Sequence, residues 1–405
     1  MENKDIKFKT PTGMKEIEIN KNDNKILEEE FKNEIIDNEN KIDYKEDAYI
    51  EVKKIEDLDK INEDLDRLEI KFEEQDKKNE ELEKEIELIS PKILEKLNNI
   101  KFKQLEILSL YKIGIKSLDF LINDNFKSLI ILEIKDNNIK TLNKISQVPF
   151  TGLKVLDLTS DDISSIEEIS NAPFKELEIL VLTNNHIKDI KPIIECSFKK
   201  LTKLDLSHND IVSIDNLGYN DSLKKLESLY LNDNQISNIS ILKKDIFKSL
   251  KELQLTNNQI KNINDMEKVL FTGLLELYLY GNQIESIDAL SKSKLENLKI
   301  LMLSQNKIKD IDCLEKCPFK QLEILNLFNN KIKNIEVLKT IPFKNIIELD
   351  LSFNEIKSVD VFLLASFKDL KVLNIEGNDF DYGNTNIQTI YNNYGIKYEY
   401  NSIII

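Results

Sequence analysis

Hydrophobic and polar residues alternate along this chain in a pattern that repeats every 24 residues. In one copy, LKELQLTNNQIKNINDMEKVLFTG, the apolar spacing fits neither a plain helix nor a plain strand. The copies follow one another in steps of 24 residues, apart from one step of 25 between Leu201 and Leu226. The twelve copies start at Leu105, Leu129, Leu153, Leu177, Leu201, Leu226, Leu250, Leu274, Leu298, Leu322, Ile346 and Leu370. A fixed internal period of this length predicts a repeat architecture.

Each part of the repeat predicts a local structure. Two leucines separated by one residue predict a short strand in which both leucine side chains point into the core. An asparagine follows where the chain leaves the strand, and its buried amide can bond backbone groups that the turn leaves unpaired. Asp161 replaces it in the third repeat and Ile113 in the first; the asparagines are Asn137, Asn185, Asn209, Asn234, Asn258, Asn282, Asn306, Asn330, Asn354 and Asn378.

The second half of the repeat predicts a return path. Its isoleucines stand three residues apart, as in a short helical or 3-10 segment. A phenylalanine then follows in most repeats, for which Leu223 and Leu295 substitute in two. Stacked repeats would align these rings into an aromatic spine.

The recurring LxxLxLxxNxIxxI pattern resembles the leucine-rich repeat family from residue 105 to about 390. The resemblance implies an α/β solenoid: a curved array with a parallel sheet on its concave face and short helical or 3-10 returns on its convex face. One repeat is too small to fold alone, so neighbours have to stack. The isoleucines are similar to those of the intracellular phosphatase-regulator type and of bacterial internalins, whose repeats are typically two residues shorter.

The flanking segments predict different structures. Residues 1–50 are acidic and poorly ordered, with a small hairpin possible between Ile6 and Ile19. Residues 51–90 carry apolar residues at heptad spacing from Leu58 to Ile89, which predicts a coiled coil. This segment either forms a homodimer, pairs with a partner helix, or folds back on its own chain as an amphipathic helix.

Caps are expected at both ends of the array. Ser90 and Pro91 indicate a break and a helix restart, so residues 91–104 are predicted to form the N-terminal cap. Residues 105–380 then hold the twelve repeats. Residues 381–405 form the C-terminal cap, with a helical turn at Ile387, Ile390 and Tyr391 and a closing strand in IKYEYNSIII.

Composition narrows the function. The net charge is −16, and Arg67 is the only arginine among 57 basic residues. Nucleic-acid binding is therefore not expected, because the electrostatic term would be repulsive. The sequence contains no apolar run long enough to span a membrane, and its first residues lack the apolar core of a signal peptide, so we expect a cytoplasmic protein. The three cysteines predict buried packing positions, with a reactive or metal-binding role as the alternative.

Acidic side chains are concentrated on the predicted concave face. In every repeat the second, fourth, sixth and seventh residues after the first leucine face solvent there. Ten acids occupy these positions: Glu133, Asp136, Asp157, Asp205, Asp233, Glu252, Glu276, Glu348, Asp350 and Glu376. Only Lys112, Lys135 and Lys203 are basic. This imbalance predicts a basic or mixed-charge protein partner.

Large apolar side chains share this face. Adjacent strands lie about 4.8 Å apart, so the group could form one patch spanning roughly 25 Å. Aromatic side chains ringed by acids are typical of interface hot spots, although aromatic residues also suit strands for their own sake. The predicted partner-binding residues are Tyr230, Tyr278, Tyr280, Met302, Phe328 and Phe353, with Asp205, Asp233, Glu252 and Glu276.

Catalytic chemistry finds little support in the sequence. It holds two histidines, His186 and His208, and no phosphate loop, HExxH or dinucleotide motif. We therefore expect an intracellular protein–protein interaction scaffold that is not an enzyme and needs no cofactor or metal. The alternatives are a regulatory subunit of a protein phosphatase and an internalin-like adhesion or surface protein.

Overall fold

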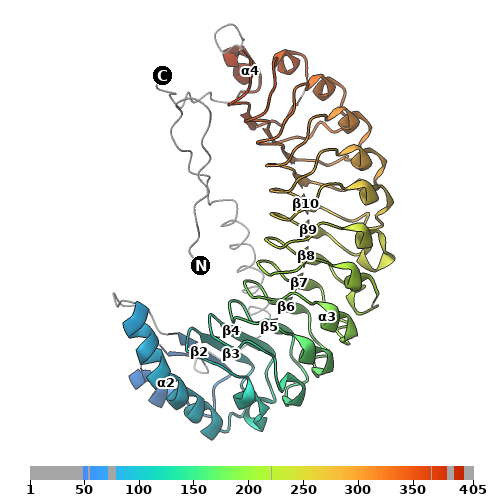
Figure 1. The fold of residues 1–405 in the computed structure, drawn as a ribbon. Helices are drawn as coiled ribbons and strands as arrows, with labels where there is room; N and C mark the ends of the chain where they lie inside the picture. Colours follow the sequence, from blue (N-terminus) through green and yellow to red (C-terminus); the bar gives the residue numbers. More distant parts are fainter. Residues whose placement is uncertain are drawn as a thin grey trace. The chain divides into compact units, whose positions relative to one another are not determined.

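The computed structural model describes residues 49–52, 55–71, 79–219, 221–365, 367–380 and 387–395. Across these residues, fourteen parallel strands form a single sheet, in which every strand pairs with its neighbours in sequence order. Figure 1 shows the repeats stacked into a curved array, with the strands along the inner side and the short helices along the outer side. The predicted leucine-rich repeat solenoid is confirmed.

The strands are short and aligned in register. Leu253 lies beside Leu229 on one side and Leu277 on the other, so equivalent residues of successive repeats form straight columns. The strands are β1 (Tyr49–Val52), β2 (Arg67–Lys71), β3 (Ile107–Tyr111), β4 (Ile131–Lys135), β5 (Val155–Asp157), β6 (Ile179–Val181), β7 (Lys203–Asp205), β8 (Ser228–Tyr230), β9 (Glu252–Gln254), β10 (Glu276–Tyr278), β11 (Ile300–Met302), β12 (Ile324–Asn326), β13 (Glu348–Asp350) and β14 (Val372–Asn374).

The return paths are mostly 3-10 turns, as the three-residue spacing of the isoleucines predicts. The α-helices are α2 (Asn79–Asn99), α3 (Lys191–Glu195) and α4 (Ile387–Asn393). The 3-10 helices are η2 (Ile55–Lys60), η3 (Asp119–Ile122), η4 (Asp124–Phe126), η5 (Ile145–Gln147), η6 (Glu167–Asn171), η7 (Asp215–Tyr219), η8 (Asp221–Leu223), η9 (Ser240–Lys243), η10 (Asp245–Phe247), η11 (Asn264–Lys268), η12 (Asp288–Lys292), η13 (Asp312–Lys316), η14 (Glu336–Lys339) and η15 (Asp360–Leu363).

The core lies between the sheet and the return paths. The paired leucines of each strand and the isoleucines of each return are buried, and so are the phenylalanines that close the repeats. Successive rings pack together at several places: the Phe150 and Phe174 rings are stacked with centroids 5.7 Å apart, and those of Phe319 and Phe343 are 5.9 Å apart. The predicted aromatic column therefore contributes to the stacking of repeats.

The coiled-coil helix predicted over residues 58–89 is wrong for residues 58–71, whereas residues 79–89 are helical as part of α2. Instead of one long helix, the chain forms η2 and then β2, which pairs with β3 so that Leu68 lies beside Leu108. The apolar residues assigned to the heptads, among them Leu58, Ile61 and Leu65, are buried in the core. They are not available for the predicted homodimer, because they already contact the solenoid.

The N-terminal cap is larger than predicted. Helix α2 runs through Pro91 without the expected break, and it buries Ile89, Ile93 and Leu97 against the core. On the N-terminal side of the twelve predicted repeats, the sheet is extended by two further strands, β2 and β1. The hairpin proposed between Ile6 and Ile19 lies outside the described residues.

At the other end, α4 confirms the predicted helical turn. It buries Ile387, Ile390 and Tyr391, and the Tyr391 hydroxyl donates a hydrogen bond to the carbonyl of Leu373 over 3.0 Å. This bond satisfies a backbone carbonyl within β14, the last strand among the described residues. The closing strand predicted in IKYEYNSIII lies outside the described residues.

Candidate functional site

The concave face is built by the solvent-facing columns of the sheet and by the turn that follows each strand. The asparagine of each repeat fixes that turn. Asn258, for example, donates hydrogen bonds to the carbonyls of Leu231, Leu255 and Thr256 and accepts the N–H of Ile236. The side chain is buried, so these bonds replace water as partners of the backbone. Because this contact recurs in successive repeats, the side chains on the face are held on a rigid frame.

Charged groups near the N-terminal end of the array are neutralised internally. The Lys135 Nζ lies 2.7 Å from a carboxylate oxygen of Glu133 and 2.8 Å from one of Asp157. The Ser109 hydroxyl donates to Glu133 over 2.6 Å, and the Thr159 hydroxyl donates to Asp157 over 2.6 Å. These five side chains form one polar network across three strands, in which two acids share one lysine.

The pKa values in this network follow from burial and charge. Burial raises the pKa of Glu133, but the charge and hydrogen bond of Lys135 outweigh it, so the pKa lies below its ordinary value. Burial dominates at Asp157, whose pKa is raised despite Lys135. Burial lowers the pKa of Lys135, but the charges of Asp157 and Glu133 outweigh it, so the pKa lies above its ordinary value. The pKa values of Glu133 and Asp157 shift in opposite directions because the two carboxylates share one cation.

Sequence reasoning counted these charges but missed their pairing. Glu133 and Asp157 are register partners on β4 and β5, and Lys135 stands two residues after Glu133 on the same face. Opposite charges at adjacent positions of a parallel sheet are the signal that could have identified the network.

In the middle of the face, tyrosines and acids form direct contacts. The Tyr230 hydroxyl donates to Glu252 over 2.5 Å, and the Lys203 Nζ lies 4.7 Å from the centre of the Tyr230 ring. The Tyr278 hydroxyl donates to Glu276 over 2.7 Å. Burial raises the pKa of Glu252 although hydrogen bonds from Tyr230 oppose the shift. The structure therefore brings together four of the residues predicted to bind a partner.

Amide side chains extend this network. Gln254 donates to Glu252 over 2.6 Å, and Asn232 donates to Gln254 over 2.6 Å. Asp233 accepts a hydrogen bond from Asn257 over 2.9 Å and lies 3.4 Å from the Nε2 of His208. Apart from the bond between Gln254 and Glu252, which lies within one repeat, these contacts join neighbouring repeats and so pre-organise the polar part of the face.

Two phenylalanines form the apolar part toward the C-terminal end. The rings of Phe328 and Phe353 meet edge to face, with centroids 5.4 Å apart. Phe353 is 38% exposed, more than most large apolar side chains of the molecule. Behind it lies Gly377, where an added Cβ would come within 3.0 Å of the Phe353 ring. The missing side chain of Gly377 therefore leaves the space that this ring occupies.

Phe353 also occupies an unusual backbone conformation. The residue that precedes the asparagine is left-handed in repeat after repeat, with φ between 50° and 67°. Most of these positions hold residues that tolerate this region: Asp136, Ser160, Asn184, His208, Asp233, Asn257, Gly281, Asn329 and Gly377. Phe353, at φ 55°, is a bulky residue in a region that such side chains rarely adopt. Strain of this kind persists where the surroundings or a function select it.

The remaining predicted residues differ in accessibility. Met302 and Tyr280 are half-buried, and Met302 is the register partner of Tyr278. Asp205 is buried, and its carboxylate accepts the N–H of Ser207 over 2.8 Å. Burial raises the pKa of Asp205. Asp205 is thus the least accessible of the acids predicted to meet a partner.

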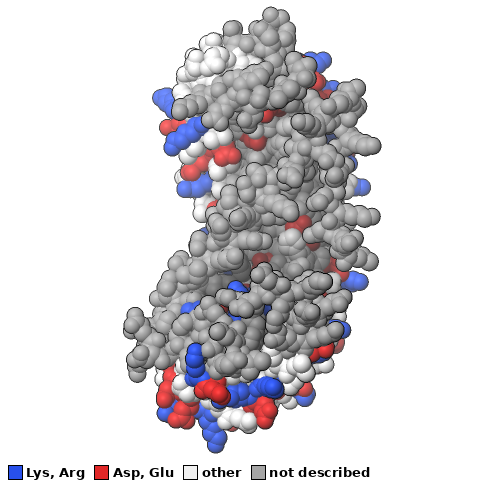
Figure 2. Space-filling model, turned by 90° about the vertical axis from the view of Figure 1, so that its left-hand side faces the viewer, with Lys and Arg blue, Asp and Glu red and all other residues white. Residues whose placement is uncertain are grey.

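The acids and lysines outside the strands are arranged differently. Where the chain enters each strand, lysines pair with glutamates of an adjacent repeat: Lys154 with Glu178, Lys200 with Glu176, Lys251 with Glu227, Lys299 with Glu323 and Lys320 with Glu296. In Figure 2 acidic and basic side chains are interspersed where they are visible. These pairs neutralise one another, so the acidic excess of the repeats lies at the concave positions.

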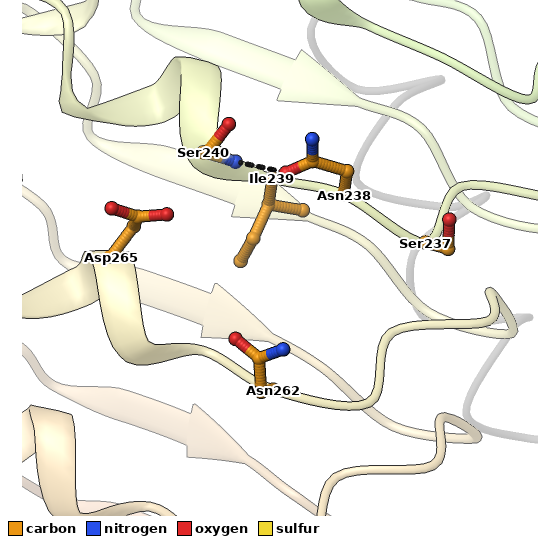
Figure 3. Close-up of a pocket in the computed structure, with 6 residues that line it drawn as sticks. All are labelled: Ser237, Asn238, Ile239, Ser240, Asn262 and Asp265. Carbon is orange, nitrogen blue, oxygen red and sulfur yellow. Dashed lines mark hydrogen bonds between the residues drawn. The ribbon is translucent and has the colours of Figure 1, made fainter.

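The best-formed hollows among the described residues are small and open to solvent. One shallow hollow of about 140 Å³ lies between two neighbouring repeats and is lined by Ser237, Asn238, Ile239, Ser240, Asn262 and Asp265 (Figure 3). Its polar groups are already engaged, since Asn238 accepts the Ser240 N–H over 2.9 Å and Asp265 pairs with Lys243 at 3.2 Å. Such a hollow has room for solvent and no assembled catalytic group.

Cys196 and Cys317 are buried, and burial raises the pKa of the Cys196 thiol above its ordinary value. In the part of the chain that the structure describes, no three histidine, cysteine or acidic side chains gather as a metal site. Among the same residues, no helix combines the length and apolarity needed to cross a bilayer.

Comparisons with known proteins identify the repeats. A family model described as leucine-rich repeats in two copies matches residues 175–219, 199–244, 224–268, 272–316 and 296–340. No curated protein matches the chain in sequence. An internalin, InlF from Listeria monocytogenes, is similar in structure with a TM-score of 0.60 and 25% identity, covering 74% of this chain and 89% of the internalin.

Two further structures share the fold. The functional domain of InlJ from Listeria monocytogenes gives a TM-score of 0.52 at 18% identity, covering 70% of this chain and 55% of that one. A TDR receptor gives 0.53 at 18% identity, covering 71% and 53%. Folds of this kind commonly present an extended concave surface to protein partners. The repeats of this chain are therefore leucine-rich repeats, and the array is similar in structure to that of an internalin.

Proposed function

We propose that this protein is a non-enzymatic scaffold that binds a protein partner on its concave face, over repeats six to twelve. The observation that carries the proposal is that acids and aromatic side chains coincide there. Asp233, Glu252, Glu276, Glu348, Asp350 and Glu376 occupy the concave positions of these repeats, and no lysine does. The three concave lysines belong to earlier repeats, where the net charge is close to balanced.

The chemistry of the partner follows from this composition. A basic segment would meet carboxylates at the strand positions, and its cationic groups could also lie over the tyrosine and phenylalanine rings. The rings supply apolar area with little loss of side-chain freedom on binding. A partner without basic residues would leave the carboxylates desolvated and unmatched. We therefore propose a basic or mixed-charge protein rather than nucleic acid.

Phe353 supports the position of the contact. An exposed aromatic ring at a left-handed backbone position stabilises the folded chain little more than asparagine or glycine would. Its edge-to-face contact with Phe328 builds an apolar platform beside the acids. Both features are explained if the ring is an anchor for the partner.

Capture from the source cell tests the proposal. The wild-type chain is compared with a concave variant, Tyr230→Ala, Tyr278→Ala, Phe328→Ala and Phe353→Ala. A matched variant, Val212→Ala, Tyr219→Ala, Leu270→Ala and Leu364→Ala, removes four exposed apolar side chains outside the strands. Circular dichroism first establishes that both variants fold.

We expect one protein to be retained by the wild type and the matched variant and lost from the concave variant. Its binding should weaken as ionic strength rises, since exposed charge pairs are screened. Equal capture by the concave variant would exclude this face. Loss with the matched variant alone would move the contact to the convex side.

A second candidate is an adhesion or surface protein, favoured by the similarity to an internalin over most of both chains. The two candidates share the concave contact and differ in compartment. The cytoplasmic location expected from the sequence stays a prediction. Labelling of intact source cells with a membrane-impermeant reagent separates them: a labelled protein supports the surface role, and an unlabelled one supports the cytoplasmic scaffold.

A further inference from the structure

Asp161 interrupts the column of asparagines at the third repeat. In the next repeat Asn185 donates its amide to the carbonyls of Leu158 and Leu182 over 2.9 and 3.0 Å. By the same geometry, the side chain of Asp161 faces the carbonyls of Ile134 and Leu158. An ionised carboxylate has no hydrogen to donate to either, so this place lacks the donor that the column provides elsewhere.

The structure shows the consequence for the two carboxylate oxygens. The Oδ1 of Asp161 accepts the N–H of Asn137 over 2.8 Å. The Oδ2 is buried and has no hydrogen-bond partner among the described residues, and the side chain as a whole is 0% exposed. A buried carboxylate oxygen without a donor is strongly destabilised as an anion.

Backbone geometry also changes at this place. Ser160 and Asp162, on either side of Asp161, are both left-handed, with φ of 59° and 56°. In the next repeats the residues equivalent to Asp162, His186 and Asp210, do not adopt this conformation. The strands change as well: β3 and β4 have five residues, and β5 has three. The junction between β4 and β5 is therefore irregular in both side chain and backbone.

From this geometry we infer that the folded array holds Asp161 as a neutral acid, and that the junction between β4 and β5 opens with release of one proton, so that acidic conditions tighten it. The protonated carboxyl supplies an O–H where asparagine supplies an amide N–H. Opening exposes the group to water, where it ionises. The junction is thus a pH-dependent weak point in an otherwise uniform array.

The surroundings favour the neutral form. Burial raises the pKa of Asp161 to about 8, and the carboxylates of Asp157, Asp136 and Asp162 add to the shift against the hydrogen bond from Asn137. Lys135 faces Asp157 at 2.8 Å, and His186 lies 3.8 Å from Asp162. Lys135 and His186 are thus directed at the acids that neighbour Asp161.

The direction of the pH effect follows from linkage. The pKa of Asp161 is higher in the folded state than in the unfolded state, where it is about 3.9. Its contribution to stability is therefore complete below about pH 4 and is lost progressively as pH rises toward the folded value. Between these limits, opening releases one proton, so the opening constant rises about tenfold per pH unit.

Hydrogen exchange measures this constant directly. In the full chain, amide exchange of residues 131–165 is followed between pH 5 and 7 and corrected for the intrinsic pH dependence of exchange. We expect the opening constant of the wild type to rise about tenfold per pH unit. In Asp161→Asn, which restores the amide donor, the opening constant should be lower, and its slope with pH should be smaller by about tenfold per pH unit.

A matched control is Asp162→Asn, which removes the adjacent, half-exposed carboxylate and keeps the slope of the wild type. A second measurement uses carbon-13 in the aspartate carboxyls: the resonance missing from Asp161→Asn should titrate near pH 8 in the wild type. A resonance that titrates below pH 5 would overturn the inference. So would an unchanged slope in Asp161→Asn, or failure of that variant to fold.

Discussion

The Nζ of Lys135 on β4 lies 2.8 Å from a carboxylate oxygen of Asp157 on β5. Asp157 is only 1% exposed, and the same lysine also neutralises Glu133. Removing the lysine leaves two buried carboxylates without the ammonium group that pairs with both. Lys135→Met should therefore lower the free energy of unfolding by about 3–5 kcal/mol at pH 7.

The loss in Lys135→Met should depend on pH. The pKa of Glu133 is lowered in the folded wild type, so its stabilising share is present above its unfolded pKa and is lost as pH falls through the folded one. The difference between variant and wild type should accordingly shrink in acid. Urea unfolding followed by circular dichroism at pH 7 and pH 4 measures it. The exposed pair of Lys154 and Glu178 is the control, since Lys154→Met should change stability by less than about 1 kcal/mol.

A second prediction concerns the asparagine column. Asn258→Ala removes donors from three carbonyls and the acceptor of Ile236, all in a buried turn. We expect a loss of about 3 kcal/mol, because the buried N–H of Ile236 is left unpaired and each of the three carbonyls loses one of its donors. Asn262→Ala, on the exposed side of the same repeat, should change the urea midpoint little. Equal midpoints for the two variants would contradict the role of the column.

Two glycines provide a third, matched test. Gly281 has φ 67°, and a Cβ added there would lie 2.0 Å from the Oδ1 of Asn257. Gly281→Ala should destabilise the fold by more than about 1 kcal/mol, as expected of alanine in an incompatible backbone conformation. Gly152 has no atom within 4 Å of the position of an added Cβ. Thermal unfolding of Gly152→Ala should show an unchanged or slightly higher midpoint.

Phe353 allows stability and binding to be separated. Phe353→Asn places a residue suited to φ 55° at this position, so the strain is relieved while the contact with Phe328 is lost. We expect the free energy of unfolding to stay within about 1 kcal/mol of the wild type. Affinity for the captured partner should fall by at least about tenfold, as for a hot-spot aromatic residue. Titration of the partner by calorimetry gives the second number, and unchanged affinity would remove Phe353 from the site.

The repeats could be predicted because their period is enforced by stacking. Each leucine column continues through neighbouring strands, so an apolar residue is required at the same position of every repeat. The segment from Leu58 to Ile70 escaped this pattern. Leu65, Leu68 and Ile70 fit the strand part of the repeat, but no asparagine follows, and α2 lengthens the path to β3. Spacings of three and four residues are shared by heptads and by this repeat, which is why a coiled coil was expected.

The concave face was predictable only in part. The columns follow from the two-residue period of the strands, which placed Tyr230, Glu252 and Phe353 on one surface. Their contacts depend on side-chain directions across neighbouring repeats, and the sequence does not specify these. The burial of Asp205 and the sharing of Lys135 by two acids arise at this level.

The asparagine contacts give the array a direction. Asn258 bonds to Leu231 and Ile236, which belong to the repeat before it, so each turn is completed by its successor. The ribosome synthesises the chain in the same order. The backbone groups of a turn therefore gain their hydrogen-bond partners only after the next repeat has emerged. The structure thus grows one repeat at a time during synthesis, and each new repeat fixes the turn of the repeat before it.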